Sequence, residues 1–350
     1  MLIQADELTS FVTQLLTTAG ADREVAQEVA EHLVQANLKG HDSHGVGMLP
    51  AYMHSISNGF LDPGAHAEVI RDQNSIMLVD GRMGFGQVVG REATELAIQR
   101  ARENALVCLG LRNAHHLGRI GTYGEMCGQA GLVSIHFVNV VGHEPQVAPW
   151  GGRERCMTTN PFCCVVPRLD DDPIVLDMAT SEVALGKVRV AHMQGVPVPE
   201  GALVDASGKP TTDASVMFEE PFGALGPFGK HKGSGLALMC ELLGGALAGE
   251  WTAQPAHERV GTIVNHMLMF VLDPAAFGNP EAFQQEVLAM ADYLHGTEPA
   301  EGFDKVRIAG DPERESLAVR LAQGIPVDDN TWAGLAQIAE TLNVAIPAGD

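Results

Sequence analysis

The sequence contains no apolar run long enough to form a membrane-spanning helix. Such a helix needs about 20 consecutive, predominantly apolar residues, whereas only 45% of this chain is apolar, in short stretches broken by polar residues. The first seven residues also lack the basic and apolar segments of a secretion signal. The sequence therefore predicts a soluble cytoplasmic protein without a membrane partner.

Positive charge is scarce in this chain. Lys and Arg number 22 against 44 Asp and Glu, which gives a formal net charge of −22. A surface of that sign repels a phosphate backbone, because nucleic-acid affinity depends on cations that replace counterions. We therefore expect no nucleic-acid partner.

Cysteine is also scarce, with six residues, no C-x-x-C pair and no spacing typical of a disulfide framework. This usage is typical of the reducing cytoplasm. Cys163 and Cys164 are adjacent in an apolar stretch, so a strand would place these small packing residues on opposite faces. The 14 histidines suggest zinc, but the pairs at 41/44 and 115/116 have no neighbouring cysteine or H-E-x-x-H helix. Zinc is therefore unsupported, and we predict no metal site.

The most reactive stretch is Asn113-Ala114-His115-His116-Leu117-Gly118-Arg119-Ile120-Gly121. The apolar residues 105–111 predict a buried strand before it, and residues 123–130 predict a helix after it. Turns at the ends of strands carry ligand sites in open α/β sheets, and histidine can exchange a proton near neutral pH. A buried structural histidine pair would explain the same residues.

A second polar cluster, Gly40-His41-Asp42-Ser43-His44-Gly45-Val46-Gly47-Met48, lies between two predicted helices. It is either a functional motif or a helix cap made by Asp42 or Ser43 with solvated histidines. A strand at 75–79 is followed by the glycine pattern Gly84, Gly86 and Gly90, which resembles a dinucleotide fingerprint with incorrect spacing. We favour a tight turn and close helix packing for these glycines.

Several later segments offer groups that could bind an anion. Thr159 and Asn160 could hold a ligand or form an Asx-type turn. A strand at 174–178 is predicted to run into a helix capped by Thr180 or Ser181, whose free N–H groups would face a phosphate. Lys230, His231 and Lys232 open a glycine-rich helix, which indicates either an anion site or a solvated basic turn.

The remaining chain predicts alternating helices and strands. A proline-rich surface loop is expected at 196–213, a strand at 262–272, a helix at 283–294, a short strand at 306–308 and a final helix through Leu342. The turn Gly310-Asp311-Pro312-Glu313 is expected to cap the helix after it. A chain of 350 residues is expected to form about two domains.

Taken together and in this order, these motifs resemble the type 2 malate/L-lactate dehydrogenase family, and within it a bacterial hydroxycarboxylate dehydrogenase branch. The resemblance spans nearly the whole chain. It implies an α/β fold with a non-Rossmann mixed-sheet NAD(P)-binding domain, similar to L-sulfolactate dehydrogenase. Residues 67–275 would form that domain, while 1–66 and 276–350 would pack together as a helical subdomain. The resemblance also implies a homodimer.

The resemblance implies roles for individual residues. His116 matches the proton donor and acceptor, and His44 lies where cofactor and substrate meet. Ser43, Met48 and Arg119 are expected to contact the substrate. The expected cofactor contacts are His44, Gly118, Arg119, Ile120, Thr159, Asn160, Asp177, Met178, Ala179, His231, Lys232, Asn265, Gly310, Asp311, Pro312 and Glu313.

The chain departs from the family at two places. Met48 stands where several relatives have an arginine that could bind the substrate carboxylate, so Arg119 could take over that bidentate contact. An apolar Met48 also favours a bulky or aromatic substrate side chain. In the C-terminal turn, Ala309 and Asp311 replace the more usual Pro and Glu, which weakens the assignment of cofactor contacts there.

We therefore predict an oxidoreductase that transfers a hydride between NAD(H) or NADP(H) and C2 of a 2-oxo or 2-hydroxy acid, with an aryl acid and NAD(H) favoured. One alternative is an imine reductase of the same family acting on a cyclic imino acid. Another is a metal-dependent hydrolase with His41, His44, His115 and His116 as ligands.

Overall fold

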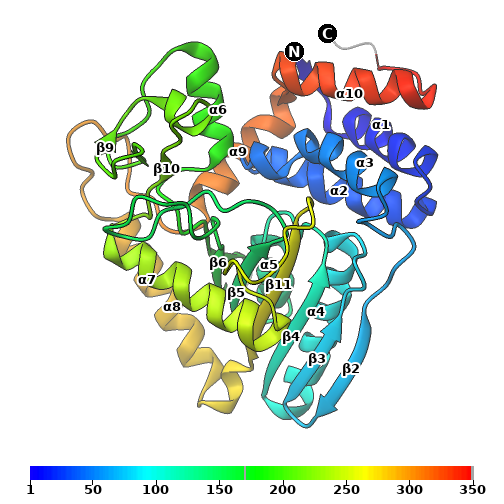
Figure 1. The fold of residues 1–350 in the computed structure, drawn as a ribbon. Coiled ribbons are helices and arrows are strands. Elements are labelled where there is room, and N and C mark those ends of the chain that lie inside the picture. The colour runs from blue at the N-terminus through cyan, green and yellow to red at the C-terminus, as the bar shows by residue number, and fades with distance from the viewer. Residues whose placement is uncertain (169–170, 348–350) are drawn as a thin grey trace.

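The computed structural model describes residues 1–168 and 171–347. Its centre is a seven-stranded sheet in the order β2-β3-β4-β11-β5-β6-β7 (Figure 1). These strands span Glu68–Gln73, Ile76–Asp80, Leu106–Ala114, Val264–Leu272, Val133–Val141, Phe162–Arg168 and Asp171–Met178, respectively. Only β3 and β4 pair in parallel, and the other neighbours are antiparallel. The predicted mixed-sheet α/β fold is therefore confirmed.

Helices cover both faces of this sheet (Figure 1). On one face, α4 (Gly86–Asn104) and α5 (Gly121–Gln129) bury small apolar residues against β4, β6 and β11. The other face carries α7 (His231–Cys240), which continues as the π-helix η4 (Glu241–Gly249) over β4, β5 and β11. A further helix, α8 (Pro280–His295), follows η5 (Pro274–Ala276) and contacts β6. No helix within the described ranges is long and apolar enough to cross a membrane.

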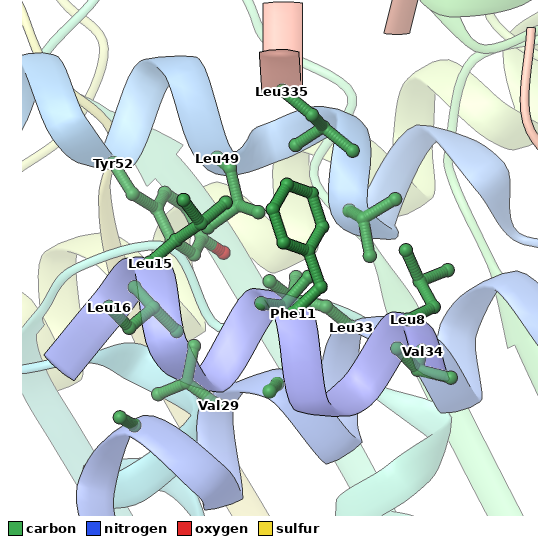
Figure 2. Close-up of a cluster of buried hydrophobic side chains, with 14 of the residues drawn as sticks. Leu8, Phe11, Leu15, Leu16, Val29, Leu33, Val34, Leu49, Tyr52 and Leu335 are labelled. Atoms are coloured by element: carbon green, nitrogen blue, oxygen red, sulfur yellow. The ribbon is translucent and has the colours of Figure 1, made fainter. Parts of the chain in front are cut away.

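The two ends of the chain form one helical layer beside the sheet (Figure 1). It contains α1 (Ala5–Thr18), α2 (Arg23–Leu38), α3 (Leu49–Ser57), α9 (Asp311–Gln323) and α10 (Asp329–Leu342). Leu8, Phe11 and Leu15 recur at helical spacing, so α1 buries one apolar stripe against α2 and α10. Figure 2 shows Phe11 beside Leu49 and Leu335, from opposite ends of the sequence. The strands β1 (Leu2–Ile3) and β12 (Ile325–Pro326) also pair antiparallel.

A third, smaller unit has its own apolar cluster of Val188, Leu203, Met217 and Leu225. It contains α6 (Leu185–Gln194), η3 (Ala214–Met217) and a small sheet of β8 (Leu203–Val204), β9 (Pro210–Thr211) and β10 (Ala224–Leu225). The sequence predicted only a surface loop at 196–213. Two-residue strands are too short to produce an alternating pattern, so composition alone could not distinguish them from a loop.

Two local predictions are wrong. The helix after β7 begins at Leu185 and not at Thr180 or Ser181. Thr180 donates its hydroxyl to the carbonyls of Thr159 and Asn160, and Ser181 forms a β-bridge with Pro227, so the chain stays extended there. Residues 306–308 form no strand either, because Arg307 is held in an irregular turn by Asp304 and Glu315.

Candidate active site

His116 lies on the predicted turn between β4 and α5, and the turn is held by hydrogen bonds to its backbone. The Leu117 N–H donates to Asn265 Oδ1 at 2.9 Å, and Tyr123 donates its hydroxyl to the Leu117 carbonyl at 2.6 Å. On the far side of Gly118, the Arg119 N–H donates to His32 Nε2 at 3.1 Å. These bonds fix the position of the His116 backbone before any ligand arrives.

Glycines allow the surrounding helices to approach this turn closely. A Cβ on Gly86, the first residue of α4, would overlap the His116 carbonyl oxygen. A Cβ on Gly90 would lie 2.6 Å from the Tyr123 ring. Gly118 has a φ of +70°, and a Cβ there would lie 2.5 Å from His32 Nε2. The glycines of the imperfect fingerprint therefore serve turn and packing geometry, as we favoured.

His44 meets His116 from the helical layer. It ends the 3₁₀ turn η1 (Asp42–His44), and its Nδ1 lies 3.3 Å from His116 Nε2 with the two rings stacked at an 18° angle. Asp42 makes no helix cap: its carboxylate accepts hydrogen bonds from Asn37 of α2 and Arg320 of α9. The motif is therefore clamped between the two ends of the chain.

Tyr52 and Gln87 complete the cluster, and neither was singled out from the sequence. The Tyr52 hydroxyl lies 2.7 Å from His116 Nδ1, and Gln87 Nε2 donates to the Tyr52 oxygen at 2.7 Å. Both side chains are buried. Tyr52 lies within the helical run of apolar residues in α3 and reads as a core aromatic. Its contact with His116, 64 positions away in the sequence, could not be predicted from the pattern of α3.

Burial disfavours the charged forms of the histidines in this cluster. Burial lowers the pKa of His116 well below its usual value, and nearby His44 and His115 lower that pKa further. Burial, then His41 and Arg119, lower the pKa of His44 to about 4. A proton on His116 therefore requires compensation from a bound anion or a new hydrogen bond.

His115 points away from His116 into a separate polar contact. Its Nε2 lies 3.1 Å from Ser55 Oγ and 3.0 Å from Thr262 Oγ1, and these hydroxyls are 2.8 Å apart. All three side chains are buried. His115 is therefore a buried structural histidine, as the alternative interpretation of the sequence proposed for both residues. His116 does not share these contacts and faces His44.

Arg119 is buried, with 1% of its side chain exposed. Its Nη1 donates to Glu125 at 2.9 Å, and its Nε lies 3.7 Å from Asp177 Oδ2. Asp177 Oδ2 also accepts from the Gly121 N–H at 2.7 Å. Burial raises the pKa of Asp177 although Arg119 opposes that shift. Arg119 Nε and Nη2 have no hydrogen-bond partner within the described ranges, so the guanidinium still has donors for an anion.

Two predicted cofactor contacts, Asn160 and Asn265, have side chains that are occupied by the protein. Asn160 accepts from Val140 and Thr158 and donates to Glu241 at 2.6 Å. Asn265 donates to the Asn139 carbonyl besides accepting from the histidine turn. In this structure both act as buried connectors between strands. Thr159 is next to Asn160, and its carbonyl accepts from Thr180.

The remaining predicted residues differ in their exposure. Ser43, His231, Lys232 and Pro312 are exposed, whereas Met48, Met178, Ala179, Asp311 and Glu313 are half-buried and Ile120 and Gly310 are buried. Met48 packs against the core of the helical layer. A Cβ added to Gly186 of α6 would lie 3.5 Å from the Cβ of Ser43. The helix α6 therefore lies next to the motif that contains His44. His231 and Lys232 open α7, where Lys230 lies over the Trp150 ring.

The C-terminal turn is joined to the same site. Glu313 Oε1 lies 3.1 Å from His41 Nε2. Asp311 is held by His295 at 2.7 Å and Arg314 at 2.6 Å, which helps to lower its pKa to about 2 despite burial. Gly310 has a φ of +93°, which glycine tolerates. In the part of the chain that the structure describes, no group of three or more His, Cys, Asp or Glu side chains could hold a metal ion.

The comparisons with known proteins agree with this architecture. Residues 3–336 match the family model described as malate/L-lactate dehydrogenase. Hydroxycarboxylate dehydrogenase B of Escherichia coli is 42% identical over 97% of this chain and 94% of its own length. The solved sulfolactate dehydrogenase of Methanocaldococcus jannaschii superposes with a TM-score of 0.86 at 33% identity, covering 98% of each chain. A solved delta1-piperideine-2-carboxylate reductase from Pseudomonas syringae has a TM-score of 0.81 at 30% identity, covering 97% of this chain and 100% of its own. The chain therefore belongs to the malate/L-lactate dehydrogenase family and is a 2-hydroxyacid dehydrogenase that uses a nicotinamide cofactor.

Proposed function

We propose that His116 is the proton donor and acceptor in the interconversion of a 2-oxo acid and its 2-hydroxy acid. The supporting observation is the hydrogen-bond cluster in which His116 Nε2 faces His44 while Tyr52 holds Nδ1. An imidazole fixed at one nitrogen presents the other in a defined direction, which proton transfer to a bound carbonyl oxygen requires. His44, at 3.3 Å from that nitrogen, lies beside the substrate position.

The residues present fit a nicotinamide dinucleotide. The start of α7 carries the positive end of the helix dipole, and the exposed cations Lys230 and Lys232 lie beside it in a chain of net charge −22. We propose that this end binds phosphate, and that residues 177–179, Gly118, Ile120 and the turn at 310–313 hold the rest of the cofactor. When bound, the nicotinamide exchanges a hydride with C2 of the substrate.

The chain's own residues handle the proton and the charge. In reduction, negative charge develops on the carbonyl oxygen, and a protonated His116 donates its Nε2 proton to that oxygen. The buried environment disfavours this cation. A substrate carboxylate nearby would raise the pKa of His116 and so couple protonation to substrate binding. The buried turn also limits the access of water to the ring.

We propose that the substrate has an apolar, bulky side chain. Half-buried Met48 lies next to η1 and contributes no charge. The substrate carboxylate would then bind Arg119, whose Nε and Nη2 are without partners within the described ranges. For Arg119→Ala, we expect a higher KM for a 2-oxo acid. A KM and kcat that both stay unchanged would refute this contact.

We propose NAD(H) as the preferred form of the cofactor. Arg119, one candidate for a 2′-phosphate contact, would bind the substrate carboxylate instead. Initial rates with NADH and NADPH at equal concentrations test the preference, and a higher kcat/KM with NADPH would refute it.

A cyclic imino acid is the second candidate substrate, because the solved reductase of that kind covers nearly the whole chain. Its imine also needs a hydride at carbon and a proton at the neighbouring heteroatom, so His116 could serve both reactions. We favour the 2-oxo acid because the family description and the other relatives named above are hydroxyacid dehydrogenases.

The test is the loss of nicotinamide absorbance with purified protein and a panel of phenylpyruvate, hydroxyphenylpyruvate, pyruvate, oxaloacetate and a cyclic imino acid. We expect the fastest turnover with an aryl 2-oxo acid. Faster turnover of the imino acid than of every oxo acid would assign an imine reductase. Membership of the dehydrogenase family leaves the hydrolase alternative without support.

We also propose a cytoplasmic homodimer. The helix α7 and its continuation η4 leave Leu238, Met239, Leu242 and Leu247 exposed, the last at 64%. Apolar patches of this kind mark protein interfaces. We expect a dimer by light scattering and a monomer for Leu247→Glu, with Ile76→Glu in β3 as an exposed control. A monomeric wild-type protein would refute the proposal.

A further inference from the structure

We propose that Arg259 and His143 are specificity-determining residues that bind a hydroxyl group at the far end of the substrate side chain. The inference rests on the proposed function for the substrate itself, a 2-oxo acid with a bulky apolar side chain. It adds that this side chain ends in an oxygen that both accepts and donates a hydrogen bond, as the phenol group of an aryl acid does.

Arg259 lies half-buried in the irregular segment between η4 and β11, and part of its guanidinium has no partner. Nη2 donates to the Ala253 carbonyl at 2.6 Å. Nη1 is buried and has no hydrogen-bond partner in the two ranges that the structure describes. Leaving a buried donor unpaired is costly, and the cost is larger for a charged group. An oxygen supplied by a ligand would remove that cost.

The segment that carries Arg259 is anchored at the active-site turn. Thr262 follows three residues later, and its Oγ1 lies 3.0 Å from His115 Nε2. His115 directly precedes His116, the proposed proton donor. A ligand that reaches Arg259 therefore lies on the side of the turn where Thr262 meets His115.

The loop after β5 joins the same segment and brings His143 into the neighbourhood of both groups. The Gly261 N–H donates to the Gly142 carbonyl at 2.9 Å. Burial is the main cause that lowers the pKa of His143, and the charge of Arg259 adds to it. His143 in turn makes a smaller contribution than burial to the lowered pKa of His116. His143 is therefore within electrostatic range of both Arg259 and His116.

A hydrogen bond of His143 decides which of its ring nitrogens can accept. Nδ1 lies 2.9 Å from the Glu144 carbonyl oxygen, which can only accept, so Nδ1 carries a hydrogen. Because burial lowers the pKa of His143, the neutral ring is favoured, and in that form Nε2 keeps a lone pair. Among the described residues, Nε2 has no hydrogen-bond partner.

An unpaired donor and an unpaired acceptor together select a hydroxyl group. Its oxygen can accept from Arg259 Nη1 while its hydrogen is donated to His143 Nε2. A carboxylate would satisfy Arg259, but its lone pairs would oppose the lone pair of His143. An unsubstituted ring would leave both groups unpaired, and a site built for a hydroxyl discriminates strongly against such an analogue. The two residues therefore favour a phenol over a plain ring or a second acid.

The test compares hydroxyphenylpyruvate with phenylpyruvate, which differ only in the ring hydroxyl. For the wild type we expect kcat/KM to be about 10- to 100-fold higher with hydroxyphenylpyruvate, because a hydrogen bond to a charged group contributes on that scale. In Arg259→Met and in His143→Phe, this preference should be lost, mainly through a higher KM for hydroxyphenylpyruvate. A purely structural role would lower kcat/KM for both substrates together and leave their ratio unchanged.

Arg153→Met is the matched control, because it removes an exposed arginine and should keep the wild-type ratio. Equal kcat/KM for the two aryl acids in the wild type, or an unchanged ratio in Arg259→Met, would overturn the inference. If oxaloacetate were reduced faster than either aryl acid and lost this advantage in Arg259→Met, the arginine would bind a second carboxylate, and the hydroxyl assignment would be wrong.

A second readout needs no turnover. Calorimetry measures the affinities of hydroxyphenylacetate and phenylacetate for the protein in the presence of reduced cofactor. We expect tighter binding of hydroxyphenylacetate in the wild type and equal affinities in Arg259→Met. This difference without turnover of any oxo acid would support the inference and overturn the proposed function. Equal affinities in the wild type, or no binding of hydroxyphenylacetate, would overturn the inference.

Discussion

Two adjacent histidines of one turn have different contacts because their side chains leave the backbone in different directions. His115 reaches Ser55 and Thr262, whereas His116 reaches Tyr52 and His44. The sequence indicated a reactive turn but left the structural alternative open. The distinction depends on partners 60 or more residues away, which no local pattern contains.

Removing the His116 ring is the simplest test at this scale. We expect His116→Gln to lower kcat for 2-oxo acid reduction about 10²- to 10⁴-fold, because general acid catalysis contributes that much. Binding of the reduced cofactor, followed by its fluorescence, should persist. His115→Gln is the matched comparison and should mainly lower stability. If the two variants had equal kcat losses at equal stability, His116 would have no special role.

Arg119 is expected to affect stability as well as binding. Arg119→Met removes the cation that Glu125 and Asp177 share in a buried site. Breaking a buried ion pair in this way costs about 3–5 kcal/mol of unfolding free energy. Urea unfolding measures the loss, with the exposed Arg153→Met as control. If Arg119→Met lost no more unfolding free energy than Arg153→Met, the ion pairs of Arg119 would contribute nothing to stability.

At the scale of elements, the position of α4 decides the geometry of the site. Gly86 begins this helix against the His116 carbonyl, and Gln87 follows it into the polar cluster. The predicted strand at 105–111 and helix at 123–130 are confirmed as β4 and α5 because their apolar residues recur at the right period. The helix predicted after residue 180 starts later because a bridge to Pro227 holds Ser181.

Gly86→Ala should displace the turn. The added methyl would overlap the His116 carbonyl oxygen, so we expect lower stability and at least a tenfold loss of kcat, since small misplacements in a site are costly. Gly235→Ala in α7 is the control, because no atom lies within 4 Å of its Cβ and alanine favours helix by up to about 1 kcal/mol. Thermal unfolding and initial rates measure both. Full activity in Gly86→Ala would contradict the close approach.

At the scale of the molecule, the two chain ends close around the site. Arg320 and Glu313 of α9 contact Asp42 and His41, which precede His44. The sequence predicted the family and, through that resemblance, the mixed-sheet fold, and both are confirmed. Composition could not predict this clamp, because its ion pairs join residues more than 270 positions apart.

Buried histidines should make the whole protein sensitive to acid. The pKa is lowered to about 3 for His32 and to about 4 for His44, His115, His136 and His266, mainly by burial. Between about pH 6.5 and pH 4 the unfolded chain binds protons that the native state does not, so stability falls as pH falls through that window. Each such histidine adds a slope of about 1.4 kcal/mol per pH unit.

Urea unfolding at pH 7.5, 6 and 5 measures this slope. His136→Asn should reduce the slope by the contribution of one proton, about 1.4 kcal/mol per pH unit. The control is Thr94→Val, which removes a buried hydroxyl of α4. It should change stability but not the slope, because neither threonine nor valine titrates in this window. An unchanged slope in His136→Asn would contradict the burial argument.

The most direct test of the central claim follows one hydrogen atom. Purified protein is incubated with reduced cofactor deuterated at the transferable C4 position and the best 2-oxo acid of the panel, and the product is analysed by mass spectrometry and proton NMR. The proposed function predicts a 2-hydroxy acid with deuterium at C2 and a solvent-derived proton on oxygen. A product with solvent hydrogen at C2, or cofactor oxidation without any 2-hydroxy acid, would contradict it.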